Sequence, residues 1–256
     1  MNRDNPSILI VDDEVDACLN LADIFTDLGY RVDIAHDGWS ALELLQKRPY
    51  DVALLDLKMP GMDGLTLYRR IKKAQPGTMV LMITAFATSE IADQALAAGA
   101  LQVLPKPVDF PILLGLVDQV LDRPLALIVD DDEDLCDNLW DLMHDRGYRV
   151  CLAHDEDDAA EQLNDCEYDI VLIDMKLPQS DGQRVFQLVK ELNSEARTIA
   201  ITGFRLETEQ LVDQMVSDGM DAVCYKPFDI SELFSTIERV GLKAPTLDSS
   251  GFRFAP

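Results

Sequence analysis

The sequence has few basic side chains. Lys and Arg together number 22 against 47 Asp and Glu, which gives a formal net charge of −25 at pH 7. Nucleic acid attracts clustered Lys and Arg and repels an acidic surface, so we expect no direct nucleic-acid partner. The deficit is uneven, because residues 1–123 carry a net charge of −7 and the remainder carries −18. We therefore expect the two halves to differ in their partners.

Long apolar segments are missing too. No apolar segment follows the start MNRDNPS, and no uninterrupted apolar run is long enough to span a bilayer. This predicts a cytoplasmic protein without secretion or membrane insertion. The five cysteines are an odd number and lack the spacing of a metal site. We interpret them as free thiols in packed positions.

The sequence contains an internal duplication. The stretch Val52 to Gly64, VALLDLKMPGMDG, returns from Ile170 to Gly182 as IVLIDMKLPQSDG. An offset of 118 residues aligns the first part of the two copies and an offset of 120 aligns the rest. We predict a first domain over 1–123, a second over 124–240, and a tail or linker over 241–256.

Short apolar runs alternate with helical patterns in each copy. In the first copy, strands are expected over 7–11, 31–35, 51–56, 79–83 and 101–104. Helices are expected over 15–28, 38–48, 64–74, 88–98 and 109–121. Five strands alternating with five helices predict an α/β domain whose parallel sheet is covered on both faces.

Reactive side chains follow the ends of these strands: Asp12 and Asp13, Asp56, Thr84 and Lys106. In a parallel sheet the carboxyl ends of the strands share one edge, where ligands bind. Clustered carboxylates suit Mg²⁺, or Mn²⁺ in its place. A carboxylate nucleophile, a hard metal and a Lys are what transfer of a phosphoryl group to Asp requires. The pattern therefore predicts a phosphoryl-acceptor site.

Each copy resembles a receiver domain of the two-component response regulator family, in ILIVDDE and LDLKMPGMDG. The resemblance implies two flavodoxin-like (βα)5 domains with strand order 2-1-3-4-5. It also implies cis peptide bonds at Lys106-Pro107 and Lys226-Pro227.

The resemblance further implies a role for each site residue. Asp56 would accept the phosphoryl group, Thr84 would bond a phosphoryl oxygen and Lys106 would pair with the acceptor. The metal would be bound by Asp13, Asp56, Asp12 through water, and the backbone carbonyl of Lys58. In the second copy the same roles fall to Asp174, Thr202, Lys226, Asp130, Asp131 and Lys176.

Two positions depart from the family pattern. Receivers usually have Tyr or Phe three residues before the strand-five Lys, where this chain has Val103 and Val223. The usual signal path through that face is therefore in doubt. Tyr225 is expected to point to the opposite side of its strand and to be an imperfect replacement. The ammonium groups of Lys58 and Lys176 are either modulators of phosphate hydrolysis or solvated loop side chains.

The remaining histidines and tryptophans give no catalytic pattern. His36 and His154 occupy equivalent positions near the end of the second strand, and we interpret them as structural. Trp39 and Trp140 are expected to be packed at helix starts or faces.

We expect a tandem-receiver response regulator that accepts phosphoryl groups from a histidine kinase or a histidine phosphotransfer protein. It would catalyse only its own phosphorylation and dephosphorylation, without a separate enzymatic domain. No helix-turn-helix pattern, basic region or second catalytic signature appears, so output is expected through a downstream protein partner. A homodimer stays open.

Three alternatives remain. The chain could be the receiver portion of a larger hybrid kinase or output protein. A Mg-dependent phosphatase of the haloacid dehalogenase kind also uses Asp on a parallel sheet, but needs its nucleophile at the end of the first strand. A scaffold with vestigial, non-phosphorylated sites is the third alternative.

Overall fold

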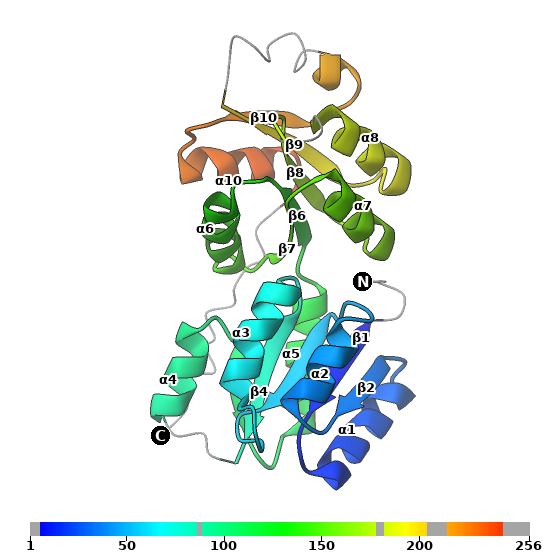
Figure 1. Cartoon of the computed structure of the whole chain (residues 1–256), viewed down its shortest axis with the longest axis vertical. Coiled ribbons are helices and arrows are strands. Elements are labelled where there is room, and N and C mark those ends of the chain that lie inside the picture. Colours follow the sequence, from blue (N-terminus) through cyan, green and yellow to red (C-terminus); the bar gives the residue numbers. More distant parts are fainter. Residues whose placement is uncertain (1–5, 86–88, 178–181, 204–213, 243–256) are drawn as a thin grey trace. The chain divides into compact units, whose positions relative to one another are not determined.

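A computed structural model describes residues 6–85, 89–177, 182–203 and 214–242 of the chain (Figure 1). The chain divides into two compact units, Met1–Asp122 and Arg123–Pro256. Most of the predicted tail at 241–256 lies outside the described residues, as does most of the expected fourth helix of the second copy. The two units are called the first and second domain below.

The first domain alternates strands and helices along its whole length. Its elements are β1 Ser7–Val11, α1 Val15–Asp27, β2 Arg31–Ala35, α2 Gly38–Leu45, β3 Val52–Asp56, α3 Gly64–Ala74, β4 Met79–Thr84, α4 Ser89–Ala97, β5 Gln102–Pro105 and α5 Phe110–Leu121. The predicted elements agree with these to within about three residues. The largest difference is at the end of α2, because Arg48 precedes a proline and this position disfavours helix.

The second domain repeats this alternation. Its elements are β6 Leu125–Val129, α6 Glu133–His144, β7 Arg149–Ala153, α7 Glu156–Asp165, β8 Ile170–Asp174, α8 Gly182–Leu192, β9 Arg197–Thr202, β10 Ala222–Tyr225 and α10 Ile230–Arg239. Residues 214–217 are also helical.

Both sheets are parallel and have the predicted strand order. The first runs β2-β1-β3-β4-β5 and the second β7-β6-β8-β9-β10, which is the order 2-1-3-4-5 within each domain. The fold class predicted from the sequence is therefore confirmed. In the first sheet Val11 pairs with Leu55 and Thr84 pairs with Pro105. The residues after these pairs thus emerge together at one edge.

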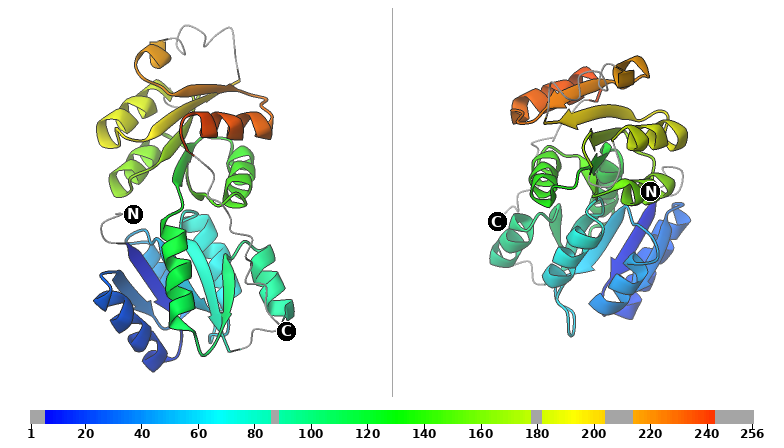
Figure 2. Two further views of the ribbon diagram at one scale, coloured as in Figure 1. Left: turned by 180° about the vertical axis from the view of Figure 1, so that it is seen from behind. Right: turned by 45° about the horizontal axis from the view of Figure 1, so that its top comes forward.

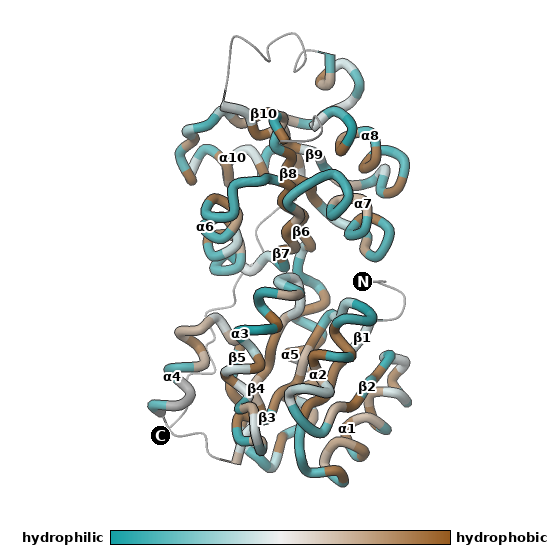
Figure 3. The backbone as a smooth tube through the Cα atoms, in the orientation of Figure 1, coloured by the Kyte–Doolittle hydropathy of each residue, from teal (hydrophilic) through white to brown (hydrophobic). Residues whose placement is uncertain are grey.

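Helices cover both faces of the sheet of the first domain (Figures 1 and 2), and an apolar layer lies on each face. Leu9, Val11 and Leu55 pack with residues of α2 and α3 on one face, and Ile8 and Ile10 pack with residues of α1 and α5 on the other. This follows from the alternation of side chains along a strand. Figure 3 shows the strands largely in brown, while the helices alternate brown with teal.

The two tryptophans have different environments. Trp140 on α6 is buried and its ring stacks on His144 with centroids 4.4 Å apart. Trp39 at the start of α2 is 59% exposed, and the guanidinium of Arg70 lies 4.9 Å from its ring centroid. The expectation of packing is confirmed for Trp140 and wrong for Trp39, because a helix start beside the sheet edge can face solvent.

In the part of the chain that the structure describes, no helix has both the length and the apolar composition that a membrane crossing requires.

Candidate functional site

The end of β1 places two carboxylates side by side. The Asp12 amide continues the sheet by donating to the carbonyl of Ala35 at 3.2 Å. The Oδ1 of the Asp12 side chain accepts a hydrogen bond of 3.0 Å from the Glu14 amide, two residues further along the chain. This local bond holds the Asp12 carboxylate in a buried position, while Asp13 next to it is exposed.

The end of β3 supplies the third carboxylate. Asp56 is buried, and its Oδ1 accepts a hydrogen bond of 3.0 Å from the Lys58 amide. Asp174 accepts the equivalent bond from the Lys176 amide, also at 3.0 Å. The side chains of both lysines are exposed at the rim of the sites. Their proposed backbone carbonyl ligands stay a prediction.

A glycine after each acceptor loop lets the following helix approach the strand end. A Cβ at Gly64 would lie 2.2 Å from the carbonyl oxygen of Asp56, and one at Gly182 would lie 2.5 Å from that of Asp174. Only glycine fits so close an approach. Asp63 caps α3 by accepting a 2.6 Å bond from the Thr66 amide. Gly64 and Gly182 therefore let the helix starts pack against the strand ends of the sites.

A lysine from the edge of the sheet joins the two buried carboxylates. Lys106 Nζ donates to Asp12 Oδ2 at 2.6 Å and to Asp56 Oδ2 at 2.7 Å. Burial alone would lower the pKa of this ammonium, but the hydrogen bonds and the charges of the two carboxylates outweigh burial and raise it. The ammonium therefore stays charged. The Lys106-Pro107 bond is cis, as the resemblance implied.

The second domain has the same arrangement. Lys226 Nζ donates to Asp130 Oδ2 at 2.6 Å and to Asp174 Oδ2 at 2.8 Å. Its pKa is raised for the same reasons, since the two carboxylates outweigh the lowering effect of burial. The Lys226-Pro227 bond is also cis.

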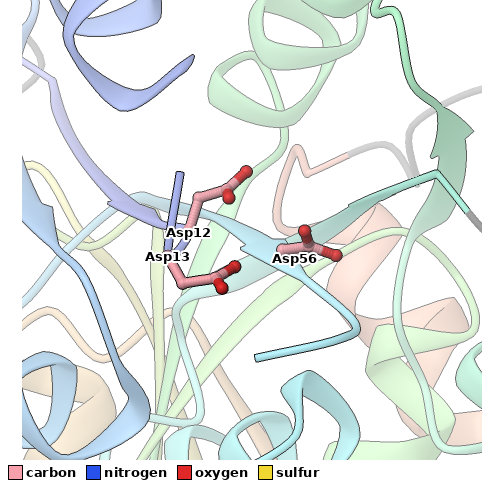
Figure 4. A group of neighbouring side chains, drawn as sticks. All are labelled: Asp12, Asp13 and Asp56. Carbon is pink, nitrogen blue, oxygen red and sulfur yellow. The ribbon is translucent and has the colours of Figure 1, made fainter. Parts of the chain in front are cut away.

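Three carboxylates converge in each domain. Ligand atoms of Asp12, Asp13 and Asp56 all lie within 4.8 Å of one another, and those of Asp130, Asp131 and Asp174 do the same. Figure 4 shows the first group, with Asp12 and Asp13 from the end of β1 and Asp56 from β3 grouped around one region.

The donor set of these groups fits a hard divalent cation. Three carboxylates and one ammonium leave a formal charge of −2, which such an ion would neutralise. All the side-chain donors are oxygens, and Mg²⁺ prefers oxygen ligands while keeping several of its waters. The third carboxylate of each group, Asp13 or Asp131, is exposed, which leaves room for water and for an entry path.

The threonines of the predicted sites end their strands beside the lysines. Thr84 and Thr202 are buried, and their carbonyls accept bonds of 2.9 and 2.7 Å from the amides of Lys106 and Lys226. They thus lie at the same sheet edge as the carboxylates. Their contact with a phosphoryl oxygen stays a prediction.

The position of the usual aromatic residue is occupied by valine in both domains. Val103 is buried in the apolar layer under α2 and α3. In β10 buried Ala222 and Cys224 alternate with half-buried Val223 and Tyr225. The expectation for Tyr225 is therefore wrong, because residues two apart on a strand share a face and Tyr225 lies on the side of Val223.

Sequence reasoning missed two neighbours of each site. Cys18 Sγ donates to the main-chain carbonyl of Asp12 at 3.3 Å, and His36 Nδ1 lies 3.3 Å from the same oxygen. Burial, followed by the charge of Asp12, raises the pKa of the Cys18 thiol to about 11, so it remains a donor. The equivalent positions of these residues in both copies were the available signal.

Comparison with known proteins gives one consistent result. Residues 8–118 and again 126–238 match the response regulator receiver domain family. A response regulator receiver protein of Anaeromyxobacter sp. (strain Fw109-5) is 33% identical over 232 residues, which cover 91% of this chain and 94% of that protein.

Two further matches each cover slightly less than half of the chain. The transcriptional regulatory protein ZraR of Escherichia coli O157:H7 is 39% identical over 121 residues, covering 47% of this chain but only 27% of ZraR. The crystal structure of a CheY-like response regulator receiver domain protein from Methanospirillum hungatei JF-1 is 33% identical and covers 46% of this chain and 94% of its own, with a TM-score of 0.45.

Proposed function

The chain belongs to the response regulator receiver family and carries two receiver domains in tandem, and from this premise we propose that each domain accepts a phosphoryl group on one aspartate. The acceptors are Asp56 in the first domain and Asp174 in the second. The observation that carries the proposal is the lysine-bridged group of three carboxylates, which occurs at the same sheet edge in both domains.

The proposed reaction moves a phosphoryl group from a phosphohistidine to a carboxylate. An Asp56 oxygen attacks the phosphorus, the bond between phosphorus and the imidazole nitrogen breaks, and the imidazole takes up a proton. Later the oxygen of a water molecule attacks the phosphorus, the acyl phosphate bond breaks, and inorganic phosphate leaves the restored carboxylate. The domain thus catalyses its own phosphorylation and dephosphorylation.

The hydrogen bonds around Asp56 support a role as nucleophile. Lys106 bonds to Oδ2 and the Lys58 amide bonds to Oδ1, so each oxygen has one donor and keeps a lone pair for another partner. The ammonium of Lys106, which bonds to the acceptor carboxylate, would neutralise the charge that develops on the transferred group. The Thr84 hydroxyl would donate a hydrogen bond to an oxygen of the same phosphoryl group.

The group of Asp12, Asp13 and Asp56 would hold Mg²⁺, or Mn²⁺ in its place. When bound, this ion supplies neutralisation of charge on the transferring oxygens. Asp12 and Asp56 are already fixed by Lys106, so they present oriented oxygens. In the second domain Asp130, Asp131 and Asp174 have the same function.

The phosphodonor would be a histidine kinase or a histidine phosphotransfer protein, and the signal would pass to a downstream protein through surface contacts. Sequence similarity to response regulators supports this pathway.

The test uses acetyl phosphate or beryllofluoride with Mg²⁺ and the full chain. Intact-mass measurement after acetyl phosphate treatment should show up to two phosphoryl groups on the wild type. Asp56→Asn and Asp174→Asn should each retain one, and the double variant none. Mass mapping of peptides locates each group.

Two results would contradict the proposal. Absence of any acyl phosphate on the wild type, at saturating Mg²⁺, would favour a non-phosphorylated scaffold. Steady release of inorganic phosphate from phosphate esters, unaffected in the double variant, would favour a phosphatase.

A further inference from the structure

One main-chain carbonyl beside each group of three carboxylates accepts hydrogen bonds from two side chains. In the first domain the carbonyl is that of Asp12, and its partners are Cys18 Sγ at 3.3 Å and His36 Nδ1 at 3.3 Å. In the second domain the main-chain carbonyl of Asp130 accepts from Cys136 Sγ at 3.3 Å and from His154 Nδ1 at 3.2 Å. A carbonyl only accepts, so each histidine must carry a proton on Nδ1.

The two donors come from different elements. Cys18 is the fourth residue of α1 and belongs to the apolar layer that includes Ile8 and Ile10. His36 follows β2 directly, and the carbonyl of the preceding Ala35 accepts from the Asp12 amide. The main chain of Asp12 is therefore held on both its N–H and its C=O side by α1 and β2.

The held carbonyl belongs to the peptide that leads to the exposed ligand. A peptide unit is planar, so the C=O of Asp12 and the N–H of Asp13 lie in one plane. Fixing this plane sets the direction in which the Asp13 side chain leaves the main chain. The Asp12 carboxylate is separately held by Lys106 and the Glu14 amide. The carbonyl contact thus acts mainly on Asp13.

We propose that Cys18 and His36 are positioning residues that orient the Asp12-Asp13 peptide for cation binding, and that Cys136 and His154 do the same for Asp130-Asp131. The inference rests on the proposed function, because it assigns a cation to the acidic groups. Partners that orient a metal ligand without touching the metal commonly control metal affinity.

Packing alone does not account for the pair. Cys18 is fully buried, but His36 is exposed, so burial of apolar area does not explain the histidine. The two domains differ at other equivalent positions, where Asp33 and Arg48 form an ion pair in the first and Cys151 and Cys166 occur in the second. The Cys and His donors are nevertheless the same in both domains.

The experiment measures Mg²⁺ affinity of the full chain by calorimetry with only the first site intact. Asp131→Asn and Asp174→Asn remove the second site. His36→Asn keeps an N–H at the place of Nδ1, while His36→Gln moves it to the place of Nε2 and His36→Leu removes it. Cys18→Ser keeps a donor and Cys18→Ala removes it.

We expect the Mg²⁺ Kd of His36→Asn and Cys18→Ser to stay near that of the background, which is the chain with Asp131→Asn and Asp174→Asn alone. His36→Leu, His36→Gln and Cys18→Ala should each raise Kd by about 3-fold. The double variant His36→Leu with Cys18→Ala should raise it by about 10-fold, which is the lower end of the range found when partners of metal ligands are removed. His154→Asn and His154→Leu, in a chain with Asp13→Asn and Asp56→Asn, are the matched pair for the second domain.

Thermal unfolding of the metal-free variants separates positioning from folding. His36 is exposed, so His36→Leu should remain folded even where Cys18→Ala does not. A folded His36→Leu with unchanged Kd, or a His36→Asn as weak as His36→Leu, would overturn the inference. Absence of Mg²⁺ binding in the background would overturn the proposed cation site and this inference together. If the Mg²⁺ Kd values change as expected but no acyl phosphate forms on the wild type, only the acceptor function would be overturned.

Discussion

In the first domain, the helix that follows the acidic pair, α1, exposes Val15 and Leu19, which are 50% and 49% accessible, whereas the second domain has Glu133 and Asp137 at these positions. The start of the next helix shows the same contrast, with exposed Trp39 in the first domain and Asp157 in the second. The carboxylates and lysines are the same in both. The chemistry of the site is therefore separable from the surface around it.

The carboxylates also differ in depth. Asp130 is fully buried, while Asp12 is 6% exposed. Burial raises the pKa of Asp130, and the hydrogen bond and charge of Lys226 offset this only in part. The second site thus combines a deeply buried charge with a more acidic surface. We expect it to depend more strongly on its lysine and on a bound cation than the first site does.

The largest expected effect tests what the two domains share. Gly64→Ala should lower the free energy of unfolding of the first domain by about 3 kcal/mol and Gly182→Ala that of the second by about 2 kcal/mol, because each Cβ would overlap a strand carbonyl. Chemical denaturation measures both. Gly115→Ala on α5 is the control, since its Cβ would meet nothing within 4 Å, and it should add about 0.5–1 kcal/mol. Equal tolerance at all three positions would contradict the close packing.

The next effect separates the domains by their lysines. Without metal, Lys226→Met should cost the second domain about 2 kcal/mol and Lys106→Met should cost the first about 1 kcal/mol, because in each site two buried carboxylates lose a partly exposed partner. Denaturation in EDTA measures the loss, and Mg²⁺ should restore part of it. Lys47→Met is the control, since Lys47 is exposed and lies two residues after the end of α2. A larger loss in the first domain would reverse the comparison.

A smaller effect concerns the buried charge itself. The folded pKa of Asp130 is raised above its ordinary value of 3.8, so the metal-free second domain is stabilised below that value and loses this contribution as pH rises through the folded pKa. Asp130→Asn should therefore raise stability at pH 7, by up to about 1 kcal/mol, and should remove this pH dependence. Thermal unfolding across pH 3 to 7 checks it, with Asp12→Asn as the matched variant. A destabilised Asp130→Asn would show that Lys226 outweighs burial.

The smallest effect concerns the acidic surface. Acetyl phosphate is an anion, so at low salt the first domain should be labelled about 2- to 3-fold faster than the second, and the ratio should approach one at high salt. Each rate is measured by mass spectrometry in a chain whose other acceptor is Asn, at saturating Mg²⁺. A ratio independent of salt would mean that the surface charge does not affect the labelling rate at the site.

Much of the fold was predictable because its signals are local. The apolar runs and helical patterns placed the strands and helices of the first domain, and the polar residues at the strand ends predicted that Asp12, Asp56 and Lys106 lie together. These predictions needed only the alternation of elements and the shared edge of a parallel sheet. The duplicated pattern gave each of them a second instance.

The remainder depends on contacts that the local pattern does not encode. The bonds of Cys18 and His36 to one carbonyl join residues from two elements, and the full burial of Asp130 depends on how its neighbours pack. The prediction for Tyr225 was wrong because alternation along β10 decides its face, and Tyr225 is two residues from Val223.

The chain has two tryptophans, and each domain holds one of them. Trp39 is exposed under the guanidinium of Arg70, whereas Trp140 is buried and stacked on His144. Their fluorescence should therefore differ, with emission at longer wavelength and easier quenching by acrylamide for Trp39. The unmodified protein thus contains a separate optical probe for each domain, so that unfolding or cation binding can be followed in one while the other serves as an internal reference.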